Sequence, residues 1–251
     1  MLPKKQIHIE VHFTPDQLDE MQLKDKNIVV IDVLRASTTI ATALERGAKE
    51  IIPVSTIENA VKISGNLFGE VTLRAGERNG KMIEGFNLGN SPLEYTNEVV
   101  KGKSIILMTT NGSVAIVKGR HAKHLVVAAF VNISAVTRFL TELKSDFMII
   151  CAGKEGHFCI EDAVCAGRII NKLGKGGSTE YVLDDGAVAA AALDKTFGKS
   201  IVRMLKSSEH GKYLASIGFG EDIPVCAQVD SMETLPTLSG NVIRIWKKST
   251  A

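Results

Sequence analysis

The fold is decided by the stretch Ile28-Val29-Val30-Ile31-Asp32-Val33-Leu34-Arg35-Ala36-Ser37-Thr38-Thr39, an apolar run that passes directly into a polar loop and then into a helix-like segment. A nearly continuous apolar run is typical of a parallel strand that is covered on both faces. The same rhythm returns at residues 50–54, 71–75, 104–108, 124–130 and 147–151, with helix-like segments at 134–143, 161–173 and 184–196. Strands that alternate with helices predict an α/β fold with three layers, α/β/α, around a largely parallel or mixed central sheet.

Both ends of the chain carry further strand-like segments. Residues 7–13 alternate apolar and polar side chains, which is the period of a half-buried strand. Near the C-terminus, residues 223–229 and 241–246 indicate two strands joined by a loop that contains Pro236, and these strands either complete the sheet or form a small subdomain. We expect one domain over residues 1–251, in which the glycine-rich stretch at 172–178 is the best candidate for an internal break.

Charge and hydropathy exclude several classes of partner. Thirty basic and 28 acidic residues leave a net charge of +2, which gives no global field that favours nucleic acid or a membrane surface. No apolar run approaches the roughly 18 residues of a membrane span, and the first ten residues lack the apolar core of a signal peptide. We therefore expect a cytoplasmic protein whose preference for anions, if it has one, is local.

The four cysteines indicate buried thiols in a reducing compartment. They stand at positions 151, 159, 165 and 226, form no Cys-x-x-Cys pair and lie among apolar or small residues. A cysteine nucleophile of the tyrosine-phosphatase kind needs an arginine six residues further on, whereas His157 occupies that position after Cys151. A cysteine nucleophile is therefore disfavoured.

Polar loops follow four of the predicted strands, and parallel strands would place all four loops at one edge of the sheet, where ligands of open α/β sheets bind. In the first loop, Asp32 is a candidate metal ligand and Arg35 a candidate clamp for two phosphate oxygens. Ser37 and Thr38 open a helix whose N-terminal amides attract phosphate. In the alternative interpretation, Asp32 and Ser37 only cap the helix and Arg35 makes a surface ion pair.

The second and third loops offer hydroxyls, amides and cations. The second, Gly76-Glu77-Arg78-Asn79-Gly80, continues to Asn90-Ser91-Pro92, where Ser91 also suits a helix N-cap with Pro92 in the first turn. The third, Thr109-Thr110-Asn111-Gly112, presents donors to an oxyanion or is a plain asparagine-glycine turn. The residues that we predict to bind the substrate or its phosphate are Arg35, Ser37, Thr38, Arg78, Asn90, Ser91, Thr109, Thr110, Asn111 and Gly112.

The fourth loop is the richest in charge. It runs through Cys151-Ala-Gly-Lys154-Glu155-Gly-His157-Phe-Cys159-Ile-Glu161-Asp162. Mg²⁺ prefers oxygen ligands, usually a few carboxylates with water and substrate phosphate. We predict that Mg²⁺ is held by Asp32, Glu77, Glu155 and Asp162. Glu161 is a weaker candidate, because acids in the first turn of a helix commonly interact with the helix dipole.

Taken together and in order, the motifs Ile31-Asp-Val-Leu-Arg-Ala36, Ala75-Gly-Glu-Arg78, Leu88-Gly-Asn-Ser-Pro92, Thr109-Thr-Asn-Gly112, Gly153-Lys-Glu-Gly156 and Glu161-Asp-Ala-Val-Cys-Ala-Gly167 resemble the 2-phosphosulfolactate phosphatase (ComB) family. Each motif is short, but the six together span most of the chain. The resemblance implies a three-layer α/β fold, a homodimer, and Mg²⁺-dependent release of phosphate from 2-phospho-3-sulfolactate, a step toward coenzyme M.

The residues suggest a mechanism in which Asp32 and the 155–162 segment hold Mg²⁺, while Arg35, Lys154 and the loop at 109–111 neutralise developing charge. His210 is a candidate general acid for the leaving alkoxide. Attack by metal-activated water is favoured over attack by Asp32, because Leu34 stands where aspartyl-phosphate enzymes usually carry a second aspartate. Two rival functions remain: a non-catalytic binder of phosphorylated metabolites, and a phosphotransferase.

Overall fold

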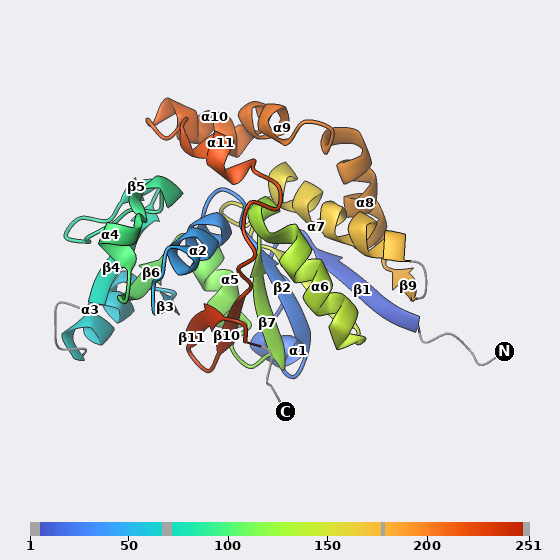
Figure 1. Cartoon of the computed structure of the whole chain (residues 1–251), viewed down its shortest axis with the longest axis horizontal. Helices are drawn as coiled ribbons and strands as arrows, with labels where there is room; N and C mark the ends of the chain where they lie inside the picture. Colours follow the sequence, from blue (N-terminus) through green and yellow to red (C-terminus); the bar gives the residue numbers. More distant parts are fainter. Residues whose placement is uncertain (1–5, 67–71, 177–178, 248–251) are drawn as a thin grey trace.

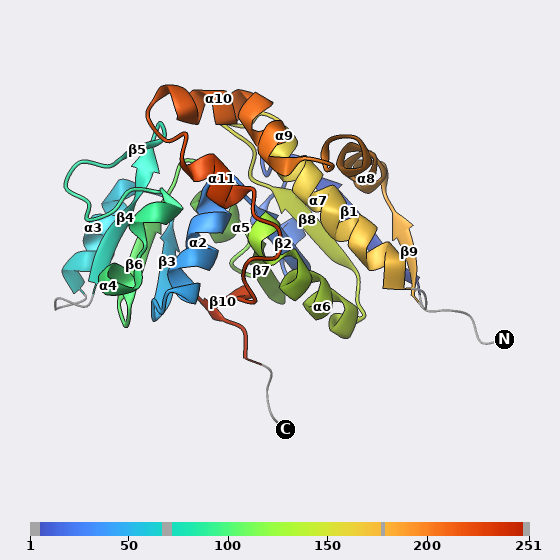
Figure 2. The same cartoon turned by 45° about the horizontal axis from the view of Figure 1, so that its top comes forward.

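The computed structural model describes residues 6–66, 72–176 and 179–247, and these form one 11-stranded sheet with helices on both faces (Figures 1 and 2). The predicted three-layer α/β fold with a mixed sheet is confirmed. The order of the strands is β5-β4-β6-β3-β11-β10-β7-β2-β8-β1-β9. In the described parts of the chain, no helix is long and apolar enough to cross a membrane.

The sheet contains two internally parallel blocks. The first block is β3 (Glu50–Val54), β6 (Ser104–Met108) and β4 (Thr72–Arg78), with the short β5 (Lys81–Met82) antiparallel to β4 at its edge. The second block is β7 (His124–Ala128), β2 (Asn27–Ile31), β8 (Phe147–Cys151), β1 (Gln6–His12) and β9 (Glu180–Leu183). The predicted strands are therefore confirmed within a few residues at their ends, except that residue 71 lies outside the described residues.

A C-terminal hairpin joins the two blocks. It consists of β10 (Pro236–Ser239), which pairs antiparallel with β7, and β11 (Val242–Ile245), which pairs antiparallel with β3. The second of the two C-terminal strands predicted from the sequence thus corresponds to β11, and the hairpin completes the sheet in its middle rather than forming a subdomain.

The prediction of a strand at 223–229 is wrong, because the segment begins in the short helix α11 (Asp222–Cys226). A short apolar run fits a buried strand and a buried helical turn equally well. Pro224 does not prevent the helix, since it falls in the first turn, where its missing N–H group would have no intrahelical partner.

Successive residues of β2 point to opposite faces of the sheet. Val29 and Ile31 pack in a core with α6 (Ile133–Leu143), α7 (Ile160–Leu173) and α8 (Asp185–Phe197). Ile28 and Val30 pack in a second core with α2 (Ala36–Glu45) and α5 (Gly112–Lys118). Both faces of the strand are buried, which explains its unbroken apolar run. The helices predicted at 134–143, 161–173 and 184–196 are confirmed as α6, α7 and α8.

The other elements are shorter or cover the first block. They are α3 (Ile57–Asn66), which packs on β3 and β6, α1 (Glu20–Leu23), α4 (Asn97–Val100), and the 3-10 turns η1 (Pro92–Glu94), η2 (Phe130–Asn132) and η3 (Gly174–Gly176). Ser91 caps η1, as its sequence context predicts. The predicted break at 172–178 begins with the end of α7 at Leu173 and continues through η3, while residues 177–178 lie outside the described residues.

Three helices near the C-terminus form an arc over the sheet, along the top of the view in Figure 1: α9 (Ile201–Ser207), α10 (Glu209–Ser216) and α11. Ser208 ends α9 and caps α10 by accepting a hydrogen bond from the Gly211 amide at 3.0 Å. A Cβ atom on Gly211 would stand 1.8 Å from the Leu205 carbonyl oxygen. The glycine therefore permits the tight passage from α9 to α10, and this passage fixes the position of His210.

Candidate active site

A narrow pocket lies where the carboxyl ends of strands from both blocks meet the underside of α10. It has about 30 Å³ of room for water. Its lining comes from the loops after β2, β4, β6 and β8 and from α10: Asp32, Leu34, Arg35, Glu77, Asn79, Gly80, Asn90, Thr110, Asn111, Lys154, Glu155, His210, Tyr213 and Leu214. All four polar loops singled out in the sequence thus contribute to one pocket, together with His210.

Asp32 stands at the end of β2 and is held by the helix that follows it. Its Oδ1 atom accepts a hydrogen bond from the Ala36 amide at 3.2 Å, and its own amide donates to the Ser37 hydroxyl at 2.9 Å. Burial raises the pKa of Asp32 to about 6; the charge of His210 opposes this rise, and the carboxylates of Glu77 and Glu161 add to it. A buried carboxylate with other carboxylates around it is a natural partner for a cation.

Gly112 lets α5 begin directly against the Asp32 carboxylate. A Cβ atom at this position would stand 2.4 Å from Asp32 Oδ2 and 2.6 Å from Ala36 Cβ. The side chain of Asp32 is therefore confined between the first turns of α2 and α5. The described structure leaves no room for a larger residue at position 112 unless Asp32 moves.

Glu77 and Asn90 bring two more oxygen donors to the pocket. Glu77 Oε1 accepts from the Thr110 amide and Oε2 accepts from the Gly80 amide, each at 2.7 Å. This carboxylate thus ties the turn after β4 to the loop after β6. Asn90 Oδ1 is buried and has no hydrogen-bond partner among the described residues. With Asp32, these side chains form a set of hard oxygen donors, which is the ligand chemistry that Mg²⁺ selects.

Arg35 is buried and engaged on three sides. Its guanidinium donates to Asp222 Oδ2 at 2.7 Å and to the Gly80 carbonyl oxygen at 2.6 Å, and it lies 4.2 Å from the ring centre of Phe219. The alternative of a surface ion pair is therefore wrong, since 1% of the Arg35 side chain and 2% of the Asp222 side chain are exposed. Asp222 also accepts a hydrogen bond from the Ser91 hydroxyl, so α11 joins two of the phosphate-binding loops predicted from the sequence.

The loop after β8 carries Lys154 and Glu155 to the mouth of the pocket. Lys154 Nζ lies 4.4 Å from the ring centre of Tyr213, whose hydroxyl donates to the Asn79 carbonyl at 3.0 Å. Glu155 has a left-handed backbone with φ of 51°, and its amide donates to Asn111 Oδ1 at 2.9 Å. Residues other than glycine that keep this conformation are often found at functional sites.

Asp162 lies behind the pocket rather than in its lining. Its two oxygens accept hydrogen bonds from the Val33 amide at 2.8 Å and the Gly153 amide at 3.1 Å. Burial, followed by the nearby carboxylates of Asp32 and Glu161, raises the pKa of Asp162 well above its usual range. Asp162 thus joins the loops after β2 and β8. Its predicted role as a metal ligand stays a prediction.

Several predicted substrate-binding residues also lie outside the lining. Ser37 and Thr38 make hydrogen bonds within the Asp32 loop, Thr38 by donating to the Val33 carbonyl at 2.9 Å. Thr109 accepts the Ser113 amide at the start of α5. The other residues in this group are Arg78, which is exposed, Ser91 and Gly112. Their role in substrate binding stays a prediction, whereas Asn90, Thr110 and Asn111 do line the pocket.

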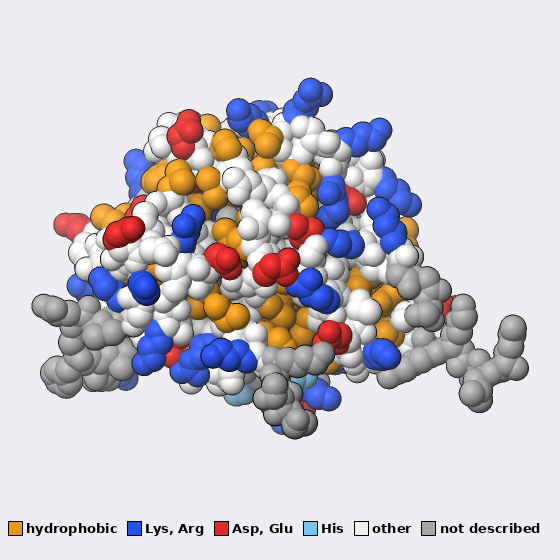
Figure 3. Space-filling model, in the orientation of Figure 1, with side chains coloured by type: hydrophobic (Ala, Val, Ile, Leu, Met, Phe, Trp, Pro, Cys, Tyr) orange, Lys and Arg blue, Asp and Glu red, His pale blue; other side chains and the backbone are white. Residues whose placement is uncertain are grey.

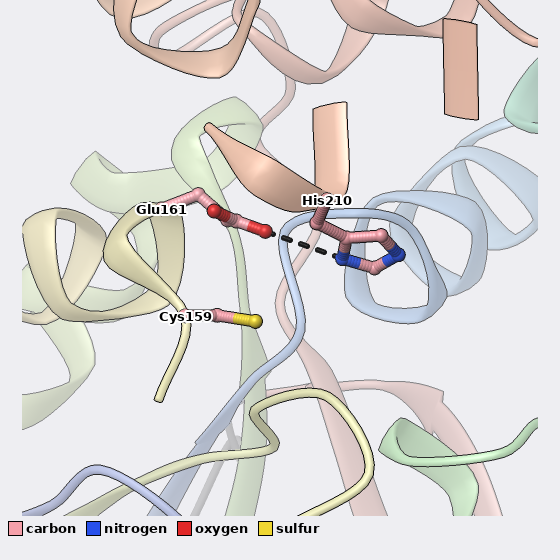
Figure 4. Close-up of side chains that lie close together, drawn as sticks. All are labelled: Cys159, Glu161 and His210. Atoms are coloured by element: carbon pink, nitrogen blue, oxygen red, sulfur yellow. Dashed lines mark hydrogen bonds and ion pairs between the residues drawn. The ribbon is translucent and has the colours of Figure 1, made fainter. Parts of the chain in front are cut away.

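His210 stands between the narrow pocket and a second, open pocket of about 440 Å³. Its Nδ1 atom lies 3.2 Å from Glu161 Oε1, and Cys159 completes a group of three side chains that face one another (Figure 4). An ionised carboxylate only accepts hydrogen bonds, so the proton of a neutral His210 belongs on Nδ1 and Nε2 keeps a lone pair. The sequence did not show that Glu161 meets His210, because 49 positions separate them.

The cysteines do not present a nucleophile in the described structure. All four are free and buried, as the sequence predicts. Burial first, and then the carboxylates of Asp162, Glu161 and Asp32, raise the pKa of the Cys159 thiol. A thiol with a raised pKa is a poor nucleophile at neutral pH.

Basic and acidic side chains are interspersed on the face shown in Figure 3. This agrees with the net charge of +2. Attraction of an anionic ligand must therefore come from cations in the pocket itself, such as Arg35 and Lys154.

Comparison with known proteins identifies the family of this chain. The family model described as 2-phosphosulpholactate phosphatase matches residues 12–241. A probable 2-phosphosulfolactate phosphatase of Caldanaerobacter subterraneus subsp. tengcongensis is 41% identical over 236 residues, covering 94% of this chain and 97% of the relative. A relative of the same name in Thermotoga maritima is 43% identical and covers 86% of this chain and 91% of its own length. Another, in Clostridium acetobutylicum, is 37% identical and covers 94% of this chain and 99% of its own length. The chain belongs to the 2-phosphosulfolactate phosphatase family.

Proposed function

We propose that this protein is a Mg²⁺-dependent phosphatase that hydrolyses 2-phospho-3-sulfolactate, or a related 2-phospho-hydroxy acid, to the free hydroxy acid and inorganic phosphate. The observation that carries the proposal is the convergence of oxygen donors and cations on one narrow pocket. Asp32, Glu77 and Asn90 supply the oxygens, and Arg35 and Lys154 supply the positive charge. Membership of the family supports the same substrate class.

The residues present fit a hard divalent cation. The carboxylates of Asp32 and Glu77 and the unpartnered amide oxygen of Asn90 would hold Mg²⁺, with Glu155 at the rim. When bound, the ion would supply a Lewis acid that polarises the phosphoryl group and lowers the pKa of a water molecule. Asp162 lies behind the lining of this pocket, and each of its oxygens accepts one backbone hydrogen bond and keeps a second lone pair that an ion could use.

The protein's own groups would stabilise the charge of the transferring phosphoryl group. Arg35 has its guanidinium fixed by Asp222 and by the Gly80 carbonyl, so its remaining N–H groups need little reorganisation to reach phosphate oxygens. Lys154 and the loop at Thr110 and Asn111 contribute donors from the opposite side. Such preorganised donors carry most of the catalytic effect in phosphoryl transfer.

His210 would supply the proton for the leaving group. In the proposed step, water adds its oxygen to phosphorus, the bond between phosphorus and the ester oxygen breaks, and His210 protonates that oxygen from Nε2, while the protons of the water leave with the inorganic phosphate. For this the ring must carry a proton on both nitrogens, and the Glu161 carboxylate at 3.2 Å from Nδ1 would hold the ring in place. We retain attack by water rather than by Asp32.

The larger pocket beside the site suits the acid portion of the substrate. The narrow pocket, with about 30 Å³ of room, is too small for a whole phosphomonoester, while the adjoining pocket of about 440 Å³ shares Lys154, Glu155 and His210 with it. We infer that the phosphoryl group enters the narrow pocket and that the carboxylate and sulfonate extend toward Lys154.

The decisive experiment measures phosphate release from 2-phospho-3-sulfolactate, 2-phospholactate and 2-phosphoglycerate with Mg²⁺ and with EDTA. We expect release only with Mg²⁺, and a loss of about 10²–10³-fold in Asp32→Asn. The control is Asp185→Asn, which changes an exposed aspartate in the first turn of α8. Binding without release would favour a phosphometabolite-binding protein, and release that depends on an acceptor would favour a phosphotransferase. Full Mg²⁺-dependent activity of Asp32→Asn would refute the assignment.

The cellular setting is part of the same proposal. We propose a cytoplasmic homodimer that serves coenzyme M synthesis, as the family resemblance implies. Light scattering coupled to gel filtration would test the dimer: a mass near twice the 27.1 kDa of one chain is expected. A mass of one chain at micromolar concentration would contradict it.

A further inference from the structure

The side chains of Cys159, Glu161 and His210 form a cluster beside the oxygen-lined pocket. One donor atom from each, the thiol sulfur, a carboxylate oxygen and a ring nitrogen, lies within 4.8 Å of the other two. Figure 4 shows the three side chains pointing into one space from α10 and from the beginning of α7. Cys159 is 7% exposed and Glu161 is 1% exposed, so the cluster is built into the protein rather than spread over its surface.

Local structure holds the three donors in place. Cys159 precedes α7 with an extended backbone, and Glu161 lies in the first turn of that helix. His210 is the second residue of α10, whose start is fixed by the Ser208 cap. The donors thus come from the N-cap and first turn of α7 and from the first turn of α10, and positions fixed by helices give a precise site.

The distances suit a shared tetrahedral ion. With metal–ligand bonds of about 2.1 Å, a nitrogen and an oxygen on one tetrahedral Zn²⁺ are about 3.4 Å apart, and a sulfur and a nitrogen about 3.6 Å. The observed separation of His210 Nδ1 from Glu161 Oε1 is 3.2 Å. Starting from at most 4.8 Å, the Cys159 sulfur needs to move by about 1 Å, which a rotation of its side chain can supply.

The donor set differs in kind from that of the neighbouring pocket. Sulfur, nitrogen and oxygen together favour Zn²⁺ and similar transition-metal ions, whereas Mg²⁺ selects oxygen alone. Three protein ligands and an open pocket of about 440 Å³ on one side leave a fourth position for water or a ligand atom. We propose that Cys159, Glu161 and His210 form a second metal site that binds a divalent ion of the Zn²⁺ class. This inference does not rest on the phosphatase activity, and an ion bound at Nδ1 would take the place of the proton that the proposed acid role of His210 requires there.

Binding requires one proton to leave the site. The Cys159 thiol loses its proton to solvent and ligates as the thiolate, while a neutral His210 moves its proton from Nδ1 to Nε2 and ligates through Nδ1. The thiolate and the carboxylate then contribute one negative charge each, and together they balance the two positive charges of the ion. The bound cluster is therefore neutral, which suits its burial.

Co²⁺ is the probe for the test, because a thiolate bound to Co²⁺ gives a charge-transfer absorption band. The metal-free protein is titrated with Co²⁺ in excess Mg²⁺, and we expect one Co²⁺ per chain with the thiolate band. Cys159→Ser should lose the band and at least about tenfold in affinity, since even the loss of an outer partner of a metal ligand costs 10–100-fold. Cys165→Ala, which removes a buried thiol from the same helix, should keep both.

Three results would overturn the proposal. They are a wild-type protein that binds Co²⁺ without a thiolate band, a band that survives in Cys159→Ser, and a band that excess Mg²⁺ abolishes. If Cys159→Ser does not fold by circular dichroism, His210→Ala serves as the second variant and should also lower Co²⁺ affinity at least about tenfold. Because Co²⁺ binding is measured directly, its outcome is independent of whether phosphate is released.

Discussion

Replacement of Gly112 by alanine should inactivate the enzyme without unfolding it. The added Cβ atom would stand 2.4 Å from Asp32 Oδ2, whereas real Cβ atoms essentially never approach another heavy atom closer than 3.0 Å. The carboxylate must therefore move by at least 0.6 Å, the difference between these two distances. A displacement near 1 Å in a catalytic arrangement costs about 10²-fold in rate, and we expect a loss of kcat of about this size.

The stability of the Gly112→Ala variant should change in a different way. Gly112 is the first residue of α5, and alanine is up to about 1 kcal/mol more favourable than glycine in a helix. Against this gain stands the contact of the added Cβ atom with Ala36 Cβ at 2.6 Å, which no side-chain rotation relieves, so the thermal midpoint should fall by several degrees while the protein stays folded. The control is Gly65→Ala in α3, where a Cβ atom meets nothing within 4 Å.

The assay compares phosphate release at saturating Mg²⁺ with thermal unfolding for the wild type and both variants. We expect Gly65→Ala to match the wild type in rate. If Gly112→Ala also kept wild-type kcat and KM, then either Asp32 would not be in its catalytic position or its position would not matter. Either result would refute the placement of Asp32 at the centre of the site.

Three further predictions concern the groups around the pocket. Asp222→Ala leaves the Arg35 guanidinium buried without its counter-charge, so urea unfolding should show a loss of about 3–5 kcal/mol; an unchanged midpoint would contradict the buried pair. Burial raises the pKa of Asp32 from 3.8 to about 6, so the folded protein binds the Asp32 proton more tightly than the unfolded chain does. The metal-free protein should therefore lose up to about 3 kcal/mol of its free energy of unfolding as the pH rises from 4 to above 6. In EDTA, Asp32→Asn should raise the free energy of unfolding at pH 8, where the loss is complete, and change it little at pH 4. Equal effects at both pH values would refute the raised pKa of Asp32. Tyr213→Phe removes the hydrogen bond, worth about 1 kcal/mol, that holds α10 to the Asn79 carbonyl at the pocket. If this bond keeps α10 in the position that binds substrate, KM should rise about fivefold with kcat nearly unchanged. A fall in kcat without a change in KM would exclude a role of Tyr213 in substrate binding.

The sequence predicts the strands well because most of them are buried on both faces. Residues 50–54, 104–108 and 147–151 coincide with β3, β6 and β8, since an apolar run between polar loops has few other interpretations in an α/β chain. The predicted loops also meet in one pocket, because the order of strand and loop is local information.

The contacts between distant segments could not be read from the sequence. Nothing in the sequence marks Asp222 as a site residue, because the apolar residues after it resemble a strand, yet it binds Arg35 across 187 positions. The pairing of Glu161 with His210 depends on how α10 crosses the beginning of α7. The unpartnered oxygen of Asn90 emerges only when every neighbouring donor has been placed.

The hairpin of β10 and β11 has a consequence for how the chain is made. β11 ends at Ile245 and is the last strand in the order of the described chain, yet it lies in the middle of the sheet. While the chain is still on the ribosome, β3 and β7 therefore each expose an unpaired edge, and such edges are sites of aggregation. The hairpin joins the two blocks only after all the other strands have been made, so a premature stop codon near position 235 would release a protein whose sheet is open at its centre.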